Sequence, residues 1–450
     1  MAGLENAGAG GRALKHPKRR RVLVIGAGWA GVSAAVHAAE SGHDVTLMEA
    51  SRQLGGRARS LCGVRFQNQS LDLDNGQHLL MTAYSATLDM MQKVGVDRSA
   101  ALLEIPLDLR LPDGQGLALP AHLSRWPSKS LMLISVLTAR GWSWHERFSM
   151  LRWGQQWERR GMRCQPSATV ADLCTDLPQR LRDEWIDPLC ISALNLPPAQ
   201  ASGQLFLNAL ADTVFSDQRH WRGLIPRVPL DQVLPQAAAN WLTQLGHSVV
   251  LGQRATSLQR TTDGWRVNAS LEAEHVVMAV PALAAADLAE QTGESSAHTW
   301  SGCARSLEHT AIATVYLHTS QRRIARAMQA LPVAHPWDAQ FVFDWSHLGR
   351  DHGVLAAVIS HATGDAGALG EHVLHQVQAT FGFTDLSLIK TVVEKRATFA
   401  ATPNLKRPTT AVAPQLWACG DYVEGRYPAT IEGAVRSAAN IPWQQLEGGI

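Results

Sequence analysis

The stretch Val22-Leu23-Val24-Ile25-Gly26-Ala27-Gly28-Trp29-Ala30-Gly31 decides the fold. Four apolar residues precede a glycine-rich turn, and the alanine-rich segment from Val32 to Ala39 follows it. A second apolar run, Val45 to Met48, then ends at the acid Glu49. A strand, a tight turn, a helix and a second strand that ends in an acid form the dinucleotide-binding βαβ pattern. The sequence therefore predicts an α/β protein with a nucleotide-binding parallel sheet.

Each residue of the glycine turn has a chemical reason. Gly26 permits the tight turn, Gly28 lets the backbone approach a pyrophosphate, and Gly31 lets the helix pack closely on the strand. Trp29 and Ala30 begin the helix, whose free N–H groups and dipole favour the phosphates of a bound nucleotide. We therefore predict a cofactor phosphate at this helix N-terminus.

The loop after the second strand distinguishes FAD from NAD. Glu49, followed by Ala50, accepts hydrogen bonds from a ribose hydroxyl and would repel a 2′-phosphate. The segment from Ser51 to Ser60 contains Gly55-Gly56-Arg57 and resembles the motif that follows the acid in flavoproteins of the amine oxidase and phytoene desaturase superfamily. In that arrangement Gly56 lets the loop fold over the pyrophosphate, and Arg57 supplies a forked donor.

A second glycine motif lies near the C-terminus. Gly420-Asp421 and the later run Pro428-Ala429-Thr430-Ile431-Glu432-Gly433-Ala434 resemble the distal flavin motif of the same superfamily. The resemblance implies that Asp421 meets the ribityl chain. It also implies that the helix containing Thr430, Ile431 and Ala434 starts beneath the isoalloxazine, where its dipole favours negative charge on the reduced ring. The two motifs together predict bound FAD.

Composition bounds the class of protein. The chain has 450 residues, 46% hydrophobic and 18% charged, and a net charge of +2. These values indicate a globular protein with a large core and give no nucleic-acid-binding footprint. The six cysteines are scattered without a CxxC pair, and the 18 histidines form no metal-binding motif. We therefore expect reduced thiols, a cytoplasmic protein and no metal site.

The positions of the motifs predict an interleaved architecture. We expect a Rossmann-type, amine oxidase-like FAD-binding domain and a discontinuous mixed α+β substrate domain. The predicted FAD-binding segments are 20–110, 225–289 and 409–450; the substrate segments are 111–224, mostly helical, and 290–408; residues 1–19 form a flexible basic leader. A hairpin around Pro112-Asp113-Gly114 marks the first exit from the nucleotide domain. Strands are predicted at 248–251, 255–258, 265–267 and 275–281, and the resemblance places Ala255 near the adenine.

The stretch Leu71-Asp72-Leu73-Asp74-Asn75-Gly76-Gln77-His78-Leu79-Leu80 is more specific than the nucleotide motif. It resembles the bacterial hydroxysqualene dehydroxylases, also called squalene-associated FAD-dependent desaturases. The segments 188–202, 226–230 and 421–436 resemble the same family, and the likeness spans about residues 20 to 440. It implies that Asn75 and Gly76 contact the flavin.

This resemblance implies a reaction of squalene and hopanoid biosynthesis with an isoprenoid lipid substrate, hydroxysqualene. Loss of water from the allylic alcohol leaves a delocalised carbocation, which takes a hydride from N5 of reduced flavin. The electron donor is not indicated, because the chain has one dinucleotide fingerprint and FAD uses it. Two alternatives stay open: an oxidative phytoene-type desaturase, and a non-enzymatic isoprenoid escort, which would have no use for Asp421.

The proton donor is the least determined residue. His78 and Gln77 are expected beside the flavin, and histidine is the natural general acid near neutral pH. The alternative is a histidine that only hydrogen-bonds the flavin or a carbonyl. Tyr84 and Glu424 are secondary candidates; the first could equally be a core ring and the second a solvated loop acid.

Membrane contact is a further open alternative. Trp126, Trp142, Trp144, Trp153 and Trp157 lie among Arg125, Lys129, Arg140, Arg147 and Arg152. Such a mixture suits either a lipid headgroup boundary or the core of a helical domain. The basic run Lys18 to Arg21 suits either anionic lipid or a solvated leader. No apolar segment is long enough to cross a bilayer, so the expected association is peripheral, at the inner membrane face.

Overall fold

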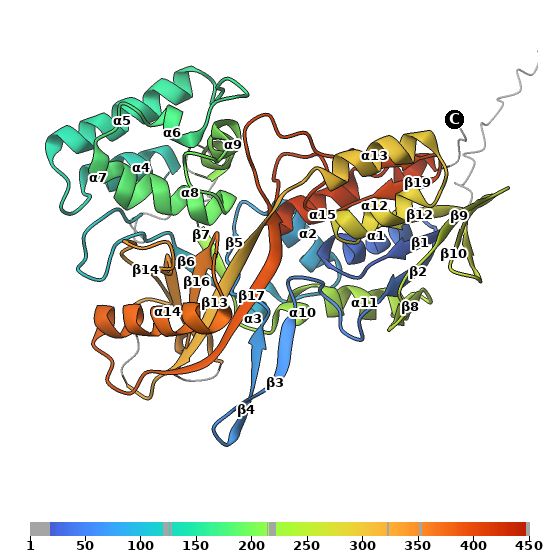
Figure 1. Ribbon diagram of the computed structural model, residues 1–450, viewed down its shortest axis with the longest axis horizontal. Coiled ribbons are helices and arrows are strands. Elements are labelled where there is room, and N and C mark those ends of the chain that lie inside the picture. The colour runs from blue at the N-terminus through green and yellow to red at the C-terminus, as the bar shows by residue number, and fades with distance from the viewer. Residues whose placement is uncertain are drawn as a thin grey trace, which may run out of the picture.

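The computed structural model describes residues 19–119, 126, 128–213, 215, 222–321, 324–350 and 353–446. Figure 1 shows a nucleotide-type sheet with its helices on one side of the molecule, a helical unit on the other, and an antiparallel sheet below that unit. Residues 1–18 of the expected leader, and Arg125 of the tryptophan-rich segment, lie outside the described residues.

The main sheet has six strands. In spatial order they are β18 (Ala411–Ala413), β19 (Leu416–Ala418), β12 (His275–Met278), β1 (Arg21–Ile25), β2 (Asp44–Glu49) and β8 (Ser248–Leu251). All neighbours pair in parallel except β18 with β19, which are antiparallel. The sheet therefore joins parts of the chain that are hundreds of residues apart, as the three predicted FAD-binding segments require.

After the exposed Arg21, strand β1 is apolar from Val22 to Ile25, because both faces of the sheet are covered. Val22 and Val24 pack in the core that contains α1 (Trp29–Glu40), α11 (Pro235–Gln244) and α15 (Ile431–Ala439). Leu23 and Ile25 pack in the opposite core with α12 (Ala282–Glu290) and α13 (Ser295–Arg305). Alternate residues of β1 thus pack on two layers of helices, and this packing holds the strand that leads into the glycine turn.

The second large sheet is antiparallel. Its strands, in spatial order, are β14 (Met328–Ala330), β15 (Phe341–Asp344), β16 (Val354–Ser360), β13 (His309–His318) and β17 (Ser387–Phe399). Helix α14 (Ala366–Phe381) packs on this sheet, and the long strands β13 and β17 run from it toward the nucleotide-type sheet (Figure 1).

Smaller strands connect the two sheets. The pair β3 (Ser60–Phe66) and β4 (Gln69–Asp74) is a hairpin, and β5 (Leu80–Met81), β7 (Arg222–Pro226) and β6 (Leu102–Pro106) form a three-stranded sheet. Helices α2 (Ser85–Lys93) and α3 (Arg98–Ala101) lie between β5 and β6 in sequence, and α10 (Leu230–Val233) follows β7. The short sheet β11-β10-β9 comprises Leu271–Ala273, Gly264–Val267 and Leu258–Thr261.

The region predicted to be mostly helical is helical. It contains α4 (Ser128–Leu137), α5 (Trp144–Arg159), α6 (Val170–Leu173), α7 (Gln179–Leu181), a π-helical turn (Arg182–Ile186), α8 (Asp187–Leu194) and α9 (Gly203–Thr213). The hairpin before it is also confirmed, because the Leu109 N–H donates to Leu117 O at 2.9 Å and the Gly114 N–H closes the turn on Leu111 O at 2.9 Å.

One predicted strand is wrong. Residues 255–257 are not in a strand, and β9 begins at Leu258 and ends at Thr261. The N–H groups of Thr256 and Ser257 donate to the side-chain oxygen of Asn268, at 2.8 and 3.4 Å, instead of joining a ladder. A side-chain acceptor twelve residues away therefore replaces the expected strand pairing.

Candidate active site

In the first glycine turn, Gly26 and Gly31 have no room for a side chain. Gly26 has φ +104°, and a Cβ there would lie 2.5 Å from the carbonyl oxygen of Ala279. A Cβ on Gly31 would lie 1.8 Å from the Gly26 oxygen. The Gly26 N–H donates to Met48 O at 2.7 Å, which joins the turn to the end of β2. Backbone atoms thus occupy the space that side chains at Gly26 and Gly31 would need.

The second glycine loop lies directly against the first. Gly28 and Gly55 form a parallel bridge, and the Gly55 N–H donates to Ala27 O at 2.9 Å. Gly56 has φ +62°, and a Cβ there would lie 3.2 Å from the Cα of Gly28. Gly28 is the N-cap of α1, and having no side chain it cannot cap the first-turn N–H groups. These groups fit the pyrophosphate of a dinucleotide.

Glu49 lies at the end of β2, beside this turn. Its carboxylate accepts the Ala27 N–H at 2.7 Å and the Ser51 N–H at 2.8 Å. Each oxygen keeps a lone pair for a further donor, so the group still fits a ribose hydroxyl. The Gln253 N–H donates to Glu49 O at 2.9 Å, which brings the segment containing Ala255 next to this strand end. Ala50 is exposed beside it.

The distal motif meets the first one through an ion pair. The guanidinium of Arg57 donates to the carboxylate of Asp421, which is only 8% exposed. Arg57 also donates to Ala397 O, near the end of β17, at 2.6 Å. The expectation for Arg57 was a contact with the pyrophosphate; in the structure its donors point at the distal motif and β17. The Gly420 N–H donates to Ser437 Oγ at 2.8 Å, which holds the motif on α15.

Helix α15 begins as the sequence indicates. The Oγ1 of Thr430, its N-cap, accepts the Gly433 N–H at 2.9 Å, and the helix starts at Ile431. Ile431 and Ala434 are half-buried, and α15 packs on α1 (Figure 1). The two glycine motifs therefore come together in space, and the uncapped turn, the acid at β2 and the distal acid fit FAD.

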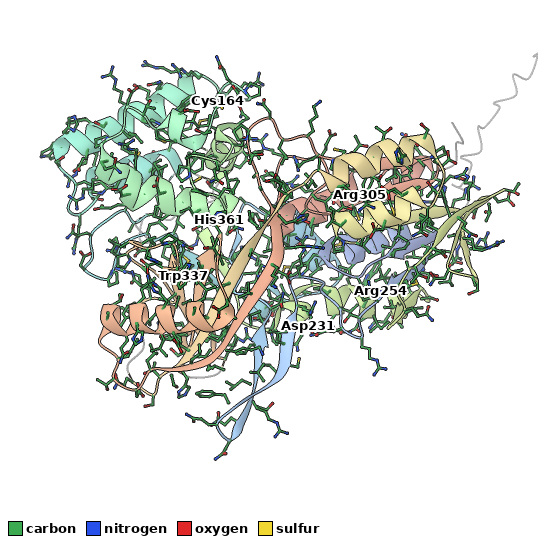
Figure 2. All side chains as sticks on the ribbon, in the orientation of Figure 1. Cys164, Asp231, Arg254, Arg305, Trp337 and His361 are labelled. Carbon is green, nitrogen blue, oxygen red and sulfur yellow. The ribbon has the colours of Figure 1, made fainter. Side chains whose placement is uncertain are left out.

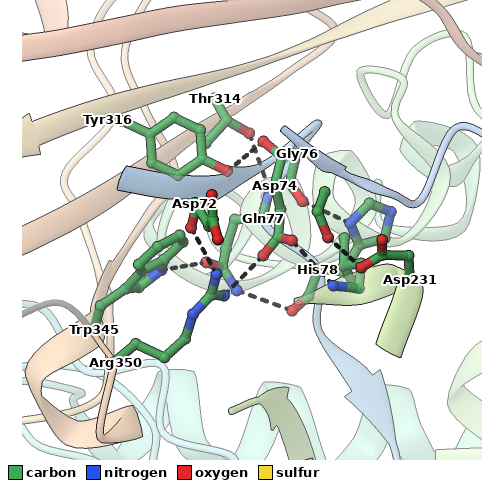
Figure 3. Close-up of polar contacts among 12 residues, drawn as sticks. Asp72, Asp74, Gly76, Gln77, His78, Asp231, Thr314, Tyr316, Trp345 and Arg350 are labelled. Carbon is green, nitrogen blue, oxygen red and sulfur yellow. Dashed lines mark hydrogen bonds and ion pairs between the residues drawn. The ribbon is translucent and has the colours of Figure 1, made fainter. Parts of the chain in front are cut away.

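The turn from Asp74 to His78 is held by a network of buried side chains (Figure 3). Arg350 donates to the Asp74 carboxylate at 2.8 Å and to Asp72 O at 3.0 Å. Tyr316 donates to Asp74 O at 2.8 Å, and the Leu230 N–H donates to the carboxylate at 3.1 Å. Burial raises the pKa of Asp74, although Arg350 opposes the shift. The end of β4 is thus fixed from three distant segments.

Gln77 continues this network. Its side-chain oxygen accepts the indole N–H of Trp345 at 2.8 Å, and its amide nitrogen donates to His78 O at 3.1 Å. The backbone N–H of Gln77 donates to Thr314 Oγ1 at 3.2 Å. The guanidinium of Arg350 lies 3.8 Å from the centroid of the Trp345 ring. The side chain of Gln77 is therefore used to position the turn.

His78 has one ring nitrogen engaged. Its Nδ1 lies 2.7 Å from the carbonyl oxygen of Gly76; a carbonyl can only accept, so Nδ1–H donates and Nε2 is the other proton site. Burial, assisted by Arg57, lowers the pKa of His78, while Gly76 and Asp74 oppose the shift. Asn75 ties this turn to the glycine loop, since its amide donates to Arg57 O at 3.1 Å.

The two secondary candidates lie on other elements. Tyr84 is the N-cap of α2, and burial raises the pKa of its hydroxyl well above the ordinary value. Glu424 is exposed in the loop between Asp421 and α15. It borders a cavity of about 260 Å³ whose lining also includes Arg407 and Arg436. Burial thus makes the Tyr84 hydroxyl a weaker acid than a solvated phenol.

Several residues of the site were not predicted. Arg350, Trp345, Thr314 and Tyr316 support the Asp74–His78 turn from more than 230 positions away. Glu432 lies within the distal motif. Its fully buried carboxylate accepts the N–H groups of Ala86 and Thr87, each at 3.0 Å, and so caps α2. The one local signal was an acid in the first turn of α15.

Comparisons with known proteins agree with this geometry. The model of the family described as flavin containing amine oxidoreductase matches residues 29–441. Hydroxysqualene dehydroxylase of Rhodopseudomonas palustris is 27% identical over 451 residues, covering 93% of this chain and 96% of the relative. The enzyme of the same name from Sinorhizobium fredii is 26% identical over 445 residues, with 93% and 96% covered.

Solved structures share the fold. An oxidoreductase from Methanosarcina mazei aligns with a TM-score of 0.70 at 14% identity, covering 94% of this chain and 99% of that one. A putrescine oxidase variant aligns with a TM-score of 0.60 at 14% identity, covering 93% and 97%. With the two glycine motifs in contact and the family model spanning both, this chain is an FAD-dependent oxidoreductase and belongs to the flavin containing amine oxidoreductase family.

Proposed function

We propose that this protein catalyses the reductive dehydroxylation of hydroxysqualene to squalene, in bacterial squalene and hopanoid biosynthesis. The observation that carries the proposal is the likeness to relatives named hydroxysqualene dehydroxylase across 93% of the chain. The reaction consumes the allylic alcohol, one proton and one hydride. It releases squalene and water: the C–O bond breaks, and a C–H bond forms at an allylic carbon.

FAD, once reduced by an external two-electron donor, supplies the hydride. The chain's own residues hold the cofactor and the proton. The groups proposed to hold FAD are the first-turn N–H groups of Trp29 and Ala30, the loops at Gly26, Gly28, Gly31 and Gly56, the acids Glu49 and Asp421, and Arg57, with contacts from Ala50, Asn75, Gly76, Ala255, Gly420, Thr430, Ile431 and Ala434.

We assign delivery of the proton to Nε2 of His78, since Nδ1 is used by Gly76. The lowered pKa makes protonated His78 a stronger acid than a free imidazolium, which suits protonation of a departing hydroxyl. Gln77, held by Trp345, keeps the turn in place. Tyr84 and Glu424 are the alternatives for this role.

An anaerobic single turnover tests the proposal. The enzyme is reduced with dithionite and mixed with hydroxysqualene, while flavin absorbance and extracted products are followed together. The expected result is flavin reoxidation at the rate of squalene formation. Reduced flavin that persists beside intact hydroxysqualene would overturn the proposal.

One observation favours a second function. Zeta-carotene desaturase of Zea mays is 34% identical over 84 residues, which cover 19% of this chain. An oxidative desaturase would run the hydride transfer toward the flavin, and a polyene such as phytoene would then bleach oxidised flavin in the absence of oxygen.

Both enzymatic functions require a substrate that partitions into lipid. We therefore propose that the protein works in the cytoplasm in peripheral contact with the inner membrane. Among the described residues, no helix combines the length and apolar character that a membrane crossing requires.

A further inference from the structure

Large exposed apolar side chains gather on one part of the helical unit. Trp144 and Phe148 of α5 are 62% and 61% exposed, and Trp126 and Leu133, before and within α4, are 49% and 46% exposed. The neighbouring tryptophans at 142, 153 and 157 are buried. The structure thus divides the tryptophan-rich segment into a core set and a solvent-facing set.

The exposed side chains follow the helical repeat. On α5 the exposed positions 144, 148, 152, 155 and 159 form one stripe, opposite the buried Met150, Trp153 and Trp157. This stripe begins with two aromatic rings and continues with Arg152, Gln155 and Arg159. On α4 the exposed stripe contains Lys129 and Leu133, and it leads to the exposed Arg140 after the helix. We call these two stripes, with Trp126, the α4–α5 face.

The two helices are antiparallel neighbours. Lys129, in the first turn of α4, pairs with Glu158, in the last turn of α5, at 2.6 Å. At the other end Arg147 donates to Ala139 O at 2.8 Å, just after α4. The hairpin lies at the outer edge of the helical unit, and side chains project outward from α5 (Figure 2). Helices α4 and α5 are far from the nucleotide-type sheet (Figure 1).

The aromatic rings are held in place rather than left loose. The guanidinium of Arg147 lies 4.8 Å from the centroid of the Trp144 ring. The Trp144 and Phe148 rings stack with centroids 6.0 Å apart. An ordered pair of exposed rings flanked by arginines loses little further entropy when it is covered by another apolar phase.

The charge of the face is one-sided. From Trp126 to Arg160 the sequence has six basic and two acidic residues. Both acids are engaged: Glu146 completes a capping box with Ser143, and Glu158 pairs with Lys129. Arginines at 140, 152 and 159 are exposed around the apolar side chains. A second copy of this face would bring like charges together, whereas an anionic surface would neutralise them.

We infer that the α4–α5 face docks on an anionic phospholipid bilayer, with Trp144, Phe148 and Leu133 in the headgroup boundary and the arginines against lipid phosphates. The reason for docking rests on the proposed function, because a substrate such as hydroxysqualene partitions into lipid. The docking itself depends only on the residues of the face, so the two can fail separately.

Vesicle flotation of the full-length holoenzyme tests the inference. The probes are vesicles of phosphatidylcholine alone and of phosphatidylcholine mixed with phosphatidylglycerol. Wild type is expected to float with the anionic vesicles and to be released by salt. The double variant Trp144→Ser/Phe148→Ser is expected to lose about tenfold or more in partition coefficient. Arg152→Gln/Arg159→Gln is expected to lose about fivefold per charge, on anionic vesicles only.

Leu245→Ser is the matched control. Leu245 is 57% exposed at the end of α11, outside the face, and its replacement should leave flotation unchanged. Retained FAD and an unchanged melting temperature show that the variants are folded. Single turnover with detergent-dispersed hydroxysqualene should be unchanged in Trp144→Ser/Phe148→Ser.

Three results would overturn the inference. The first is a folded wild type that does not bind anionic vesicles, and the second is a Trp144→Ser/Phe148→Ser variant that floats as wild type does. The third is a wild type that is a dimer while the Trp144→Ser/Phe148→Ser variant is a monomer. The last would show that a second copy covers the face. Squalene formation in detergent together with absent flotation would sink the docking and leave the proposed function standing. Flotation without squalene formation would contradict the proposed function and leave the docking inference standing.

Discussion

At the nucleotide-binding loops backbone packs on backbone, whereas at the Asp74–His78 turn side chains from distant segments pack on one another. Gly26 and Gly31 exclude a Cβ because main-chain atoms occupy its place, and Gly56 has a positive φ that disfavours a side chain. The turn instead depends on Arg350 and Trp345, which reach it from the other sheet. A backbone-built site tolerates almost no substitution. A site built from side chains fails in proportion to the contacts removed.

Replacement of Gly31 should have the largest effect. In Gly31→Val the new Cβ would fall 1.8 Å from Gly26 O, so the turn must open and the protein should purify without FAD. The ratio of flavin to protein absorbance measures this. Gly302→Ala, in α13 with no atom within 4 Å of its new Cβ, is the control and should keep FAD and gain up to about 1 kcal/mol of stability. A Gly31→Val protein that retains FAD would contradict the view that backbone packing at this turn is required for FAD binding.

Replacement of Arg350 tests the side-chain network that supports the Asp74–His78 turn. Arg350→Met leaves the Asp74 carboxylate buried without its cation, so the free energy of unfolding should fall by about 3 to 5 kcal/mol. Urea denaturation measures the change. Asp74→Asn/Arg350→Met should recover part of the loss, because the amide carries no charge and can still accept the Leu230 N–H. Equal losses in the single and double variants would show that the ion pair does not hold the turn.

The pH dependence of turnover tests His78. Acid catalysis needs the protonated ring, and the pKa of His78 lies below its ordinary value of about 6.5. The single-turnover rate should therefore rise as pH falls below neutrality and level off below that pKa. His78→Gln should lose about a hundredfold at acid pH and lose the titration, since general acids contribute on the order of 10² or more. A wild-type profile in His78→Gln would move the role to Tyr84 or Glu424.

The smallest expected effect is at the cap of α15. Thr430→Ala removes the acceptor for the Gly433 N–H and should cost about 1 kcal/mol of unfolding free energy, with weaker FAD binding. Asp365→Ala removes the cap of α14, the helix that packs on the antiparallel sheet, and should cost a similar amount without changing FAD affinity. Thermal unfolding and flavin titration separate the two. Equal FAD affinity in both variants would mean that the Thr430 cap serves folding alone.

The same contrast explains what could be read from the sequence. The glycine turn, Glu49 and Thr430 carry local requirements that a motif preserves, so the parallel sheet and FAD were predictable. Arg350 and Trp345 act on residues about 270 positions away and have no local signature. The strand expected at 255–258 was displaced by the side chain of Asn268, which a propensity argument does not include. The tryptophans could have been divided by the helical repeat, since 153 and 157 share a face that excludes 144.

The buried carboxylate of Glu432 has a consequence for biogenesis. Through Ala86 and Thr87 it joins α15 to α2, while Arg57 joins the first glycine loop to Asp421. The ribosome makes residues 411–439 after every other strand of the main sheet. Until they emerge, α2 lacks its cap and Arg57 lacks its counterion, so a nascent chain presents only half of the flavin cradle. The complete FAD site proposed above therefore forms only after residues 411–439 have been synthesised.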